Sequence, residues 1–261
     1  MSGLLQRIVE RARERSALER VHDPLASVKS RLRRATAPVR PLRAALEDAA
    51  GGPCIIAELK RTSPVNGILR EDFRPVELAK ELAGAGATAL SILTEEEFFH
   101  GNPMFLRQVR AVVSLPLLRK DFVLDEYEVY RSRLLGADAV LLIAALLSEE
   151  QLRSLVLAGR EAGIDALVEV HDESEARRAL GCGARFIGVN NRDLDTFEVD
   201  LGTSRRLAGL FPSGVTTVSE SGLRTRDDLR ALSQAGYRGF LIGEQLMRAP
   251  RPGAALKELL S

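Results

Sequence analysis

The sequence predicts an α/β protein with the architecture of a (β/α)8 TIM barrel and an additional helical extension at its N-terminus. Eight short apolar runs lie between residues 54 and 243, and most of them follow a glycine and end in polar residues. Helical patterns such as VELAKELAGAG and RTRDDLRALSQAG separate the runs. Eight strand–helix units in about 210 residues fit this barrel, whose usual size is about 250 residues. A doubly wound sheet is the alternative, and it is disfavoured because no Gly-x-Gly-x-x-Gly segment follows the first run.

Residues 1–50 form the predicted extension, and residues 51–261 form the barrel. At residues 4–21, apolar side chains recur at the spacing of an amphipathic helix, with Arg and Glu between them. The first 50 residues contain eleven Lys or Arg and six Asp or Glu, and the basic bias continues through two prolines to Arg40 and Arg43. Two interpretations stay open: a solvated basic arm, or an arm with some cations facing an anionic ligand.

The eight predicted strands are continuous apolar runs, which are typical of parallel strands buried on both faces. A glycine before a run suits the end of the preceding helix, because helices favour glycine at the C-terminal cap. The strands are expected at residues 54–60, 89–94, 117–121, 139–144, 166–170, 186–190, 216–220 and 240–243.

Charge and cysteine content exclude several classes of function. The formal net charge is +1, so we expect no nucleic-acid partner. Cys54 and Cys182 lack CxxC or metal-type spacing, which suits buried thiols in a reducing cytoplasm. The longest apolar run, residues 139–147, is too short to span a bilayer, and the first thirty residues lack the apolar region of a signal peptide. We therefore expect a cytoplasmic protein without a disulfide and without a membrane partner.

The first predicted strand ends in two charged side chains, within the segment IIAELKRTSP at residues 55–64. Because side chains alternate along a strand, Glu58 and Lys60 point to the same side. Burial of two opposite charges is costly unless partners or ligands compensate for the lost hydration. An isolated pair of this kind is interpreted first as a structural ion pair.

The other strand ends change that interpretation. The active site of a (β/α)8 barrel lies at the carboxyl ends of its strands, so these ends predict the site residues. The inward positions below them are apolar or small: Ile56, Leu118, Leu141, Ile143, Leu167, Gly188 and Val218. The remaining ends carry Glu95, Lys120 with Asp121, Glu169, Asn190 with Arg192, Glu220 with Ser221 and Gly222, and Gly243.

The last two strands lead into the glycine-rich turns SESG and IGE. Each segment alone fits an ordinary turn. The loops after strands seven and eight are, however, the usual phosphate site of this fold, because turns and helix N-termini offer backbone N–H groups to anions. We therefore expect a phosphorylated small molecule as ligand.

The lysines at the strand ends suggest general acid catalysis. A neighbouring cation and partial burial both lower a lysine pKa from its usual value of about 10.4, which suits an acid that works near neutral pH. Lys60 and Lys120 share the expected mouth with Glu58 and Glu169. His171 has no second histidine nearby, so we expect no metal site.

Seven segments together resemble the indole-3-glycerol phosphate synthase family, the ring-closing enzymes of tryptophan biosynthesis. They are IIAELKRTSP, LTEEEFFHG, LPLLRKDF, LVEVH, FIGVNNRDL, SESGL and FLIGEQLM. The resemblance runs from about residue 55 to residue 247 and implies that the extension partly covers the barrel mouth. It also implies conversion of 1-(2-carboxyphenylamino)-1-deoxyribulose 5-phosphate to indole-3-glycerol phosphate, with loss of carbon dioxide and water and without a cofactor.

The resemblance further implies a role for each site residue. Lys120 would protonate the carbonyl oxygen, and Glu169 would stabilise the developing cation and act as a base. Glu58 and Lys60 would serve the dehydration or hold the substrate. Asn190 and Glu220 would orient the reacting hydroxyl region, and Arg192 would help to hold the substrate carboxylate. The phosphate would be bound by Ser63, Ser221, Gly222 and Gly243. The anthranilate ring would be lined by Phe99, Phe122, Leu141 and Ile143.

Glu244 departs from the small residue that relatives often have after the last glycine. Because a carboxylate repels phosphate, we expect only its backbone N–H to contribute and its side chain to point away.

Two other functions stay open. One is a different phosphosugar barrel, either an isomerase or an aldolase that forms an imine through Lys60 or Lys120. The other is a noncatalytic phosphometabolite-binding barrel, which the combination of acids, bases and phosphate turns disfavours. We expect a monomer or a weak homodimer.

Overall fold

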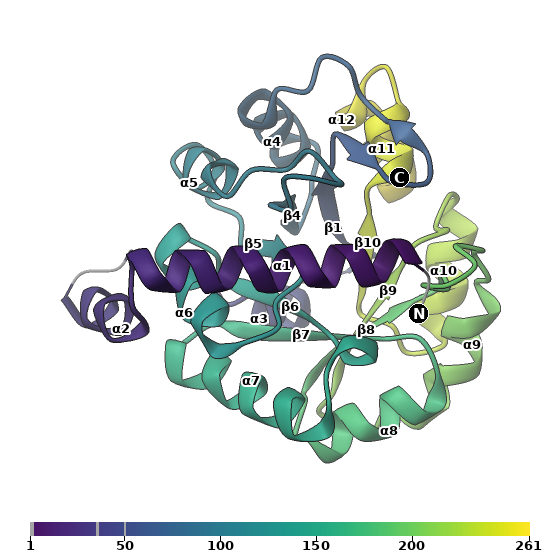
Figure 1. Ribbon diagram of the computed structural model, residues 1–261. Coiled ribbons are helices and arrows are strands. Elements are labelled where there is room, and N and C mark those ends of the chain that lie inside the picture. The colour runs from purple at the N-terminus through teal and green to yellow at the C-terminus, as the bar shows by residue number, and fades with distance from the viewer. Residues whose placement is uncertain (1–2, 35–36, 50) are drawn as a thin grey trace.

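The computed structural model describes residues 3–34, 37–49 and 51–261, and its centre is a closed barrel of parallel strands. Figure 1 looks toward one end of this barrel, with helices arranged around it. The strands follow the order β1, β10, β9, β8, β7, β6, β5 and β4 around the barrel. They are β1 (Cys54–Leu59), β4 (Ala89–Leu93), β5 (Leu117–Lys120), β6 (Ala139–Ile143), β7 (Asp165–Val170), β8 (Phe186–Asn190), β9 (Thr216–Glu220) and β10 (Gly239–Ile242). The predicted (β/α)8 barrel is confirmed, and each strand end lies within one residue of its prediction.

Local sequence signals account for where the outer helices begin and end. Ser148 and Gln151 form a capping box at the start of α7 (Glu149–Ala162). Asp125 caps α6 (Glu126–Leu135) by accepting a hydrogen bond from the backbone of Glu128. Gly136 and Gly163 end these helices in the left-handed conformation, with φ of 96° and 72°. The outer helices are α4 (Pro75–Gly84), α5 (Met104–Arg110), α6 (Glu126–Leu135), α7 (Glu149–Ala162), α8 (Glu173–Gly181), α9 (Gly202–Leu207), α10 (Arg226–Gln234), α11 (Glu244–Arg248) and α12 (Pro252–Leu260).

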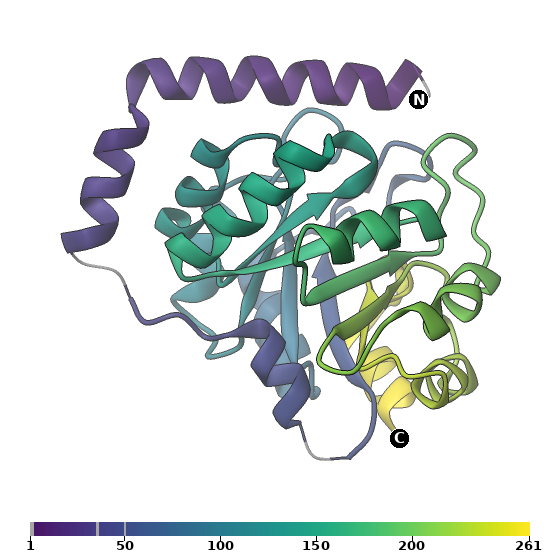
Figure 2. The ribbon, with the colours of Figure 1, turned by 90° about the horizontal axis from the view of Figure 1, so that it is seen from below.

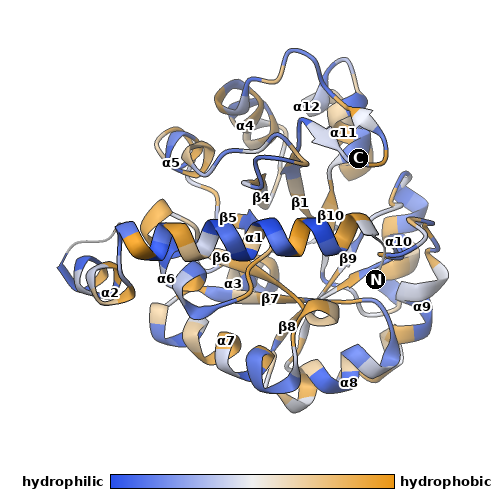
Figure 3. Ribbon diagram, in the orientation of Figure 1, coloured by the Kyte–Doolittle hydropathy of each residue, from blue (hydrophilic) through white to orange (hydrophobic). Residues whose placement is uncertain are grey.

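Each strand buries one face inside the barrel and the other against the helices. Figure 3 shows apolar residues concentrated on the strands and mixed polarity along the outer helices. On β1, Ile56 faces the barrel interior, whereas Ile55 and Ala57 join the layer between strands and helices. The interior cluster contains six of the residues predicted to point inward, namely Ile56, Leu118, Leu141, Ile143, Leu167 and Val218. The packed interior leaves polar chemistry to the strand ends.

The N-terminal segment contributes helices to both ends of the barrel. It comprises α1 (Gly3–His22), α2 (Leu25–Arg34) and α3 (Leu42–Asp48). Figure 2 shows α1 lying across one end and α3 at the opposite end. Leu42 and Leu46 of α3 are fully buried and join the interior cluster. The α3 helix therefore closes the amino-terminal end of the barrel.

The basic residues after α2 bind the protein itself. Arg40 donates hydrogen bonds from Nη1 to the carbonyls of Val113 and Leu115, at 2.8 and 3.1 Å. The backbone N–H of Arg43 donates to Asp165, the first residue of β7, at 2.9 Å. Both residues thus lie at the amino ends of the strands, away from the carboxyl ends where the site is expected.

Cys54 and Cys182 are free thiols, and both are buried. Over the described ranges, no helix combines the length and apolar character that a membrane crossing requires.

Candidate active site

Two adjoining cavities open where the strands end, and together they contain every residue that the sequence predicted for the site except Glu95. The first, called the acid–base pocket, lies among Glu58, Lys60, Lys120, Glu169, Asn190 and Glu220, with an apolar wall of Phe99, Phe122, Leu141 and Ile143. The second, called the glycine pocket, is lined by Gly222, Gly243, Arg192, Arg224 and Arg248. The two cavities share Glu58, Lys60, Arg192, Ser221, Leu241 and Glu244.

Lys120 forms the centre of the acid–base pocket, at the end of β5. Its Nζ donates to Glu169 Oε2 at 2.8 Å and to Glu220 Oε2 at 2.7 Å. Burial disfavours the charged ammonium, but the two carboxylates outweigh burial and raise the pKa of Lys120. The predicted lowering of this pKa is therefore wrong, because the nearest charges are anions and not a second lysine.

Glu169 is held as an anion by cations on two sides. His171 Nε2 lies 3.3 Å from Glu169 Oε1, and Asn190 donates to the same oxygen at 3.2 Å. Burial favours the neutral acid, but Lys120 and His171 together lower the pKa of Glu169. His171 also contacts Glu175 at 3.1 Å, and although burial opposes its charge, the two carboxylates raise its pKa to about 10. The imidazolium is thus a fixed positive charge beside Glu169.

Glu220 differs from Glu169 because, among the described residues, Lys120 is the only cation that faces it. Burial and the neighbouring charge of Glu169 raise the pKa of Glu220 to about 7, against the opposing effect of Lys120. Its Oε1 finds no hydrogen-bond partner within the described residues. Two acids that share one ammonium are expected to separate in this way, with one ionised and the other able to carry a proton.

Gly188 makes room for the Glu220 carboxylate. A Cβ atom added to Gly188 would lie 2.1 Å from Glu220 Oε1. The sequence predicted Gly188 only as a small inward residue. Its neighbour in space explains why the side chain has to be absent.

Glu58 and Lys60 form the remaining charged pair of the mouth. Lys60 Nζ lies 2.8 Å from Glu58 Oε1, with side chains 19% and 3% exposed. Ser91 donates to the other Glu58 oxygen at 3.4 Å. A Cβ atom at Gly243 would lie 2.5 Å from Glu58 Oε1, so this glycine allows the carboxylate to reach the boundary of the two pockets.

The apolar wall of the acid–base pocket joins the barrel to α1. The rings of Phe99 and Phe122 are 6.2 Å apart at an angle of 40°. Leu5 and Ile8 of α1 line the same cavity. Glu95, which the sequence placed among the strand ends, instead accepts hydrogen bonds from the backbone of Phe99 at 2.9 Å and of Glu97 and Phe98. It fixes the loop that carries the ring.

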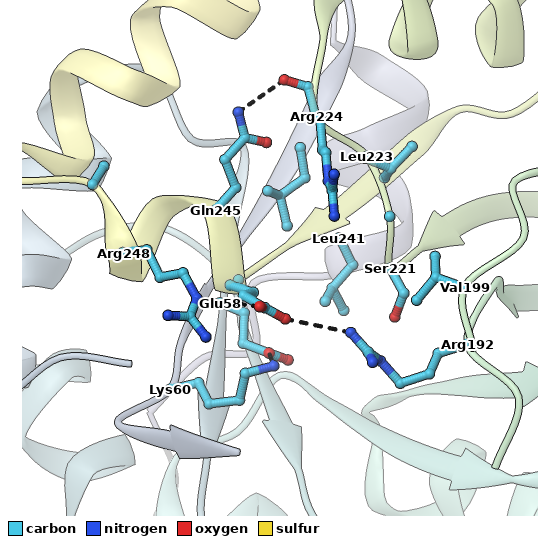
Figure 4. Close-up of a pocket in the computed structure, with 15 residues that line it drawn as sticks. Glu58, Lys60, Arg192, Val199, Ser221, Leu223, Arg224, Leu241, Gln245 and Arg248 are labelled. Atoms are coloured by element: carbon cyan, nitrogen blue, oxygen red, sulfur yellow. Dashed lines mark hydrogen bonds and ion pairs between the residues drawn. The ribbon is translucent and has the colours of Figure 1, made fainter. Parts of the chain in front are cut away.

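The glycine pocket surrounds the turns predicted to bind phosphate. Ser221 and Gly222 both have left-handed backbones, with φ of 65° and 78°. A Cβ at Gly222 would meet Val199 Cγ1 at 2.4 Å, so only glycine fits there. Figure 4 shows Arg192 and Arg248 reaching into this pocket from opposite sides. Ser63, the other predicted phosphate residue, lines the acid–base pocket instead.

The expectation that the Glu244 side chain points away is wrong. Glu244 lines both pockets, and its carboxylate contacts Arg192 at 3.3 Å and Arg248 at 3.2 Å. Asn66 donates to the same carboxylate at 2.9 Å. The acid occupies a position between cations that the sequence could not reveal, because Arg192 lies 52 positions away in the chain.

An ion-pair network beneath Lys120 also escaped sequence reasoning. Arg119 is fully buried and lies 2.9 Å from Asp121 and 2.7 Å from Glu128. Arg15 of α1 reaches the other oxygen of Asp121 at 2.8 Å. This network ties α1 to the strand that carries Lys120. His171 directly follows β7, which ends at Val170, and stands two positions after Glu169, so the alternation of side chains along the strand could have placed the two side by side.

Within the described part of the chain, no group of three or more His, Cys, Asp or Glu side chains is arranged to hold a metal ion. The closed barrel and the cluster at its strand ends define the class of protein. It is a (β/α)8 barrel with buried acids and lysines at its strand ends, beside a glycine-lined pocket.

Comparisons with known proteins identify the family. Residues 5–259 match the family described as indole-3-glycerol phosphate synthase. An indole-3-glycerol phosphate synthase of Carboxydothermus hydrogenoformans is 52% identical over 84% of this chain and 84% of that protein. One of Albidiferax ferrireducens is 46% identical over 100% of this chain and 99% of that protein. The chain belongs to the indole-3-glycerol phosphate synthase family.

Solved structures with low sequence identity share the fold. A 3-hexulose-6-phosphate synthase superposes with a TM-score of 0.62 at 17% identity, covering 79% of this chain and 97% of that chain. KGPDC from Streptococcus mutans gives a TM-score of 0.60 at 14% identity, covering 80% of this chain and 96% of that chain. These likenesses concern the barrel alone.

Proposed function

We propose that this site closes the indole ring of 1-(2-carboxyphenylamino)-1-deoxyribulose 5-phosphate, with the residue roles given below. Membership of the family makes the chain a decarboxylating lyase of tryptophan biosynthesis that acts on a small phosphorylated substrate. The observation that carries the proposed roles is the placement of Lys120 between Glu169 and Glu220, beside an apolar wall and next to the glycine pocket.

The two pockets suit the two ends of the substrate. The carboxyphenyl ring would lie against Phe99, Phe122, Leu141 and Ile143, because burial of an aromatic ring against apolar side chains is favourable. The phosphate would lie near Gly222 and Gly243. Arg192 lines both pockets, including the glycine pocket. We therefore assign it to the phosphate end of the substrate and not to the substrate carboxylate.

Ring closure needs an acid at the ketone. The aniline nitrogen supplies electrons to the ring, and the ring carbon that bears the carboxylate forms the new bond to the ketone carbon. The ketone oxygen gains the electron pair and takes a proton from Lys120. A raised pKa keeps Lys120 protonated at neutral pH, and an alkoxide is a stronger base than an amine, so this transfer still runs toward the oxygen.

Glu169 would stabilise the positive charge that develops on nitrogen in this step. Its lowered pKa keeps it ionised, and His171 and Asn190 fix its position. Loss of carbon dioxide then returns the bonding electrons to the ring and removes that charge.

Dehydration requires one proton for the leaving hydroxyl and removal of another from the new ring. Glu220, with a pKa of about 7, is present in both protonation states near neutral pH and suits this exchange. Lys60 and Glu58 lie at the boundary of the pockets and would assist the same step. Asn190 would orient the hydroxyl region.

The fluorescence of indole provides the test of this function, because the chain contains no Trp. Mixing the protein with the carboxyphenylamino substrate is expected to give a rising indole signal over a low background. The proposal fails if no signal appears. Borohydride in the presence of substrate is expected to trap no adduct, since a protonated Lys120 is a poor nucleophile for imine formation; a trapped adduct would support the aldolase instead.

We also propose that residues 1–50 are an extension of the barrel formed by residues 51–261, with α1 covering the barrel mouth, and that the protein acts in the cytoplasm as a monomer or weak homodimer. Contacts of Leu5 and Ile8 with the acid–base pocket support the cover. Free, buried thiols at Cys54 and Cys182 suit a reducing compartment. Residues of a single chain line both pockets, so a partner subunit is not needed to complete them.

A further inference from the structure

Glu244 brings a negative charge into the pocket proposed to bind phosphate. It is the first residue of α11, directly after Gly243. Its Oε2 accepts from Arg192 at 3.3 Å and from Asn66 at 2.9 Å, and its Oε1 accepts from Arg248 at 3.2 Å. Three donors from three different loops or helices therefore converge on one carboxylate.

The charges of the glycine pocket show what Glu244 does to the cations there. Lys60 is paired with Glu58 at 2.8 Å. Arg192 and Arg248 are both paired with Glu244, with side chains 27% and 49% exposed. A phosphate near Gly222 and Gly243 would be attracted by the same two guanidinium groups, since Arg binds phosphate and carboxylate through the same N–H donors.

We propose that Glu244 is an internal competitor of the substrate phosphate and sets the affinity of the glycine pocket for anions. A phosphate held by Arg192 or Arg248 has to take over hydrogen bonds that the Glu244 carboxylate makes with them, and it also meets the repulsion of that carboxylate. This inference deepens the proposed function and rests on it for the identity of the phosphate.

The competition has a consequence for catalysis. The phosphate takes no part in the bond changes of the reaction, so it contributes the same binding energy to the substrate complex and to the product complex. Uniform binding of this kind lowers KM without raising kcat, and it retains product. An acid that weakens phosphate binding therefore favours release of the product and limits occupation of the site by inorganic phosphate.

The test replaces the charge while keeping the shape, with Glu244→Gln, and measures the dissociation constant of inorganic phosphate by calorimetry. Two unit charges about 5 Å apart at an effective dielectric constant near 40 interact strongly enough to change affinity roughly tenfold. We expect phosphate to bind about tenfold more tightly to the variant and KM for the substrate to fall. Asp227→Asn, which removes an exposed acid paired with Arg230 on α10, is the matched control and is expected to leave phosphate binding unchanged.

A second substitution tests the route of the effect. If the gain comes from freeing a guanidinium, adding Arg248→Gln to Glu244→Gln is expected to cancel much of it, which a double-mutant cycle would measure. Unchanged or weaker phosphate binding in Glu244→Gln, with a native melting temperature, would overturn the inference and make Glu244 a residue that positions the arginines. The proposed function is tested separately by the indole signal of the unmodified protein, so either proposal can fail without the other.

Discussion

Gly188→Ala tests whether the position of the Glu220 carboxylate matters for the reaction. Gly188 lies on β8 inside the barrel, and its backbone does not have a positive φ, so alanine is compatible with the local conformation. The new Cβ would lie 2.1 Å from Glu220 Oε1, 3.2 Å from Cδ of the same carboxyl group and 3.5 Å from Leu167 Cδ1. The only severe contact is therefore with the carboxyl group.

The carboxyl group has to move by about 1 Å or more to reach an ordinary van der Waals distance from the new atom. That movement breaks the 2.7 Å contact between Lys120 Nζ and Glu220 Oε2. Overpacking of this kind typically costs about 1–3 kcal/mol in free energy of unfolding. A displacement of about 1 Å in a catalytic group lowers turnover on the order of a hundredfold. We expect both effects in Gly188→Ala.

The assays are steady-state indole formation and thermal unfolding, with Gly181→Ala as the control. Gly181 ends α8, and a Cβ there meets no atom within 4 Å. The control is expected to keep full activity and stability. In the double variant Gly188→Ala with Glu220→Ala, the clash is gone, so the added alanine is expected to cost little beyond Glu220→Ala alone. Near-normal kcat and melting temperature in Gly188→Ala would refute the reasoning.

Three further predictions concern protonation at the same site. Lys120→Ala is expected to lower kcat on the order of a hundredfold or more with a modest effect on substrate binding, and a near-normal rate would remove Lys120 from the acid role. Folding raises the pKa of Glu220 from 4.5 to about 7, so its contribution to stability is present below pH 4.5 and is lost as the pH rises through 7. The difference in melting temperature, Glu220→Gln minus unmodified protein, is therefore expected to be more positive at pH 8 than at pH 4.5. Equal differences at both pH values would contradict the assignment. His171→Gln removes a cation that lowers the pKa of Glu169, so the acidic limb of the kcat/KM profile is expected to move to higher pH, whereas an unmoved limb would show that His171 does not act through Glu169.

The pKa of Lys120 is raised and not lowered as predicted, because the residues at the strand ends do not by themselves show which charges are neighbours. The sequence puts Glu58 and Lys60 on the same side of one strand, but it does not show which acids of other strands lie beside Lys120. In the structure Lys120 lies between Glu169 and Glu220, and Lys60 is paired with Glu58. An ammonium within 3 Å of two carboxylates is stabilised as a cation, whatever burial alone would do.

The sequence by itself determined the barrel, the order of its strands along the chain and the residues at their carboxyl ends. These follow from local signals: apolar runs of strand length, glycines at helix ends such as Gly136 and Gly163, and the alternation that puts Glu58 and Lys60 on one side. The predicted site residues, apart from Glu95, accordingly line one of the two adjoining pockets.

Only the tertiary structure decided the distances between charges from different strands, and with them the opposite pKa shifts of Glu169 and Glu220. It paired Glu244 with Arg192 and Arg248, put Gly188 beside Glu220, and tied Arg15 of α1 to Asp121. Electrostatic interactions depend on separation and burial, which residues far apart in the chain acquire only when the barrel closes. Local pattern thus predicts which groups reach the mouth, and their packing sets the chemistry that each can perform.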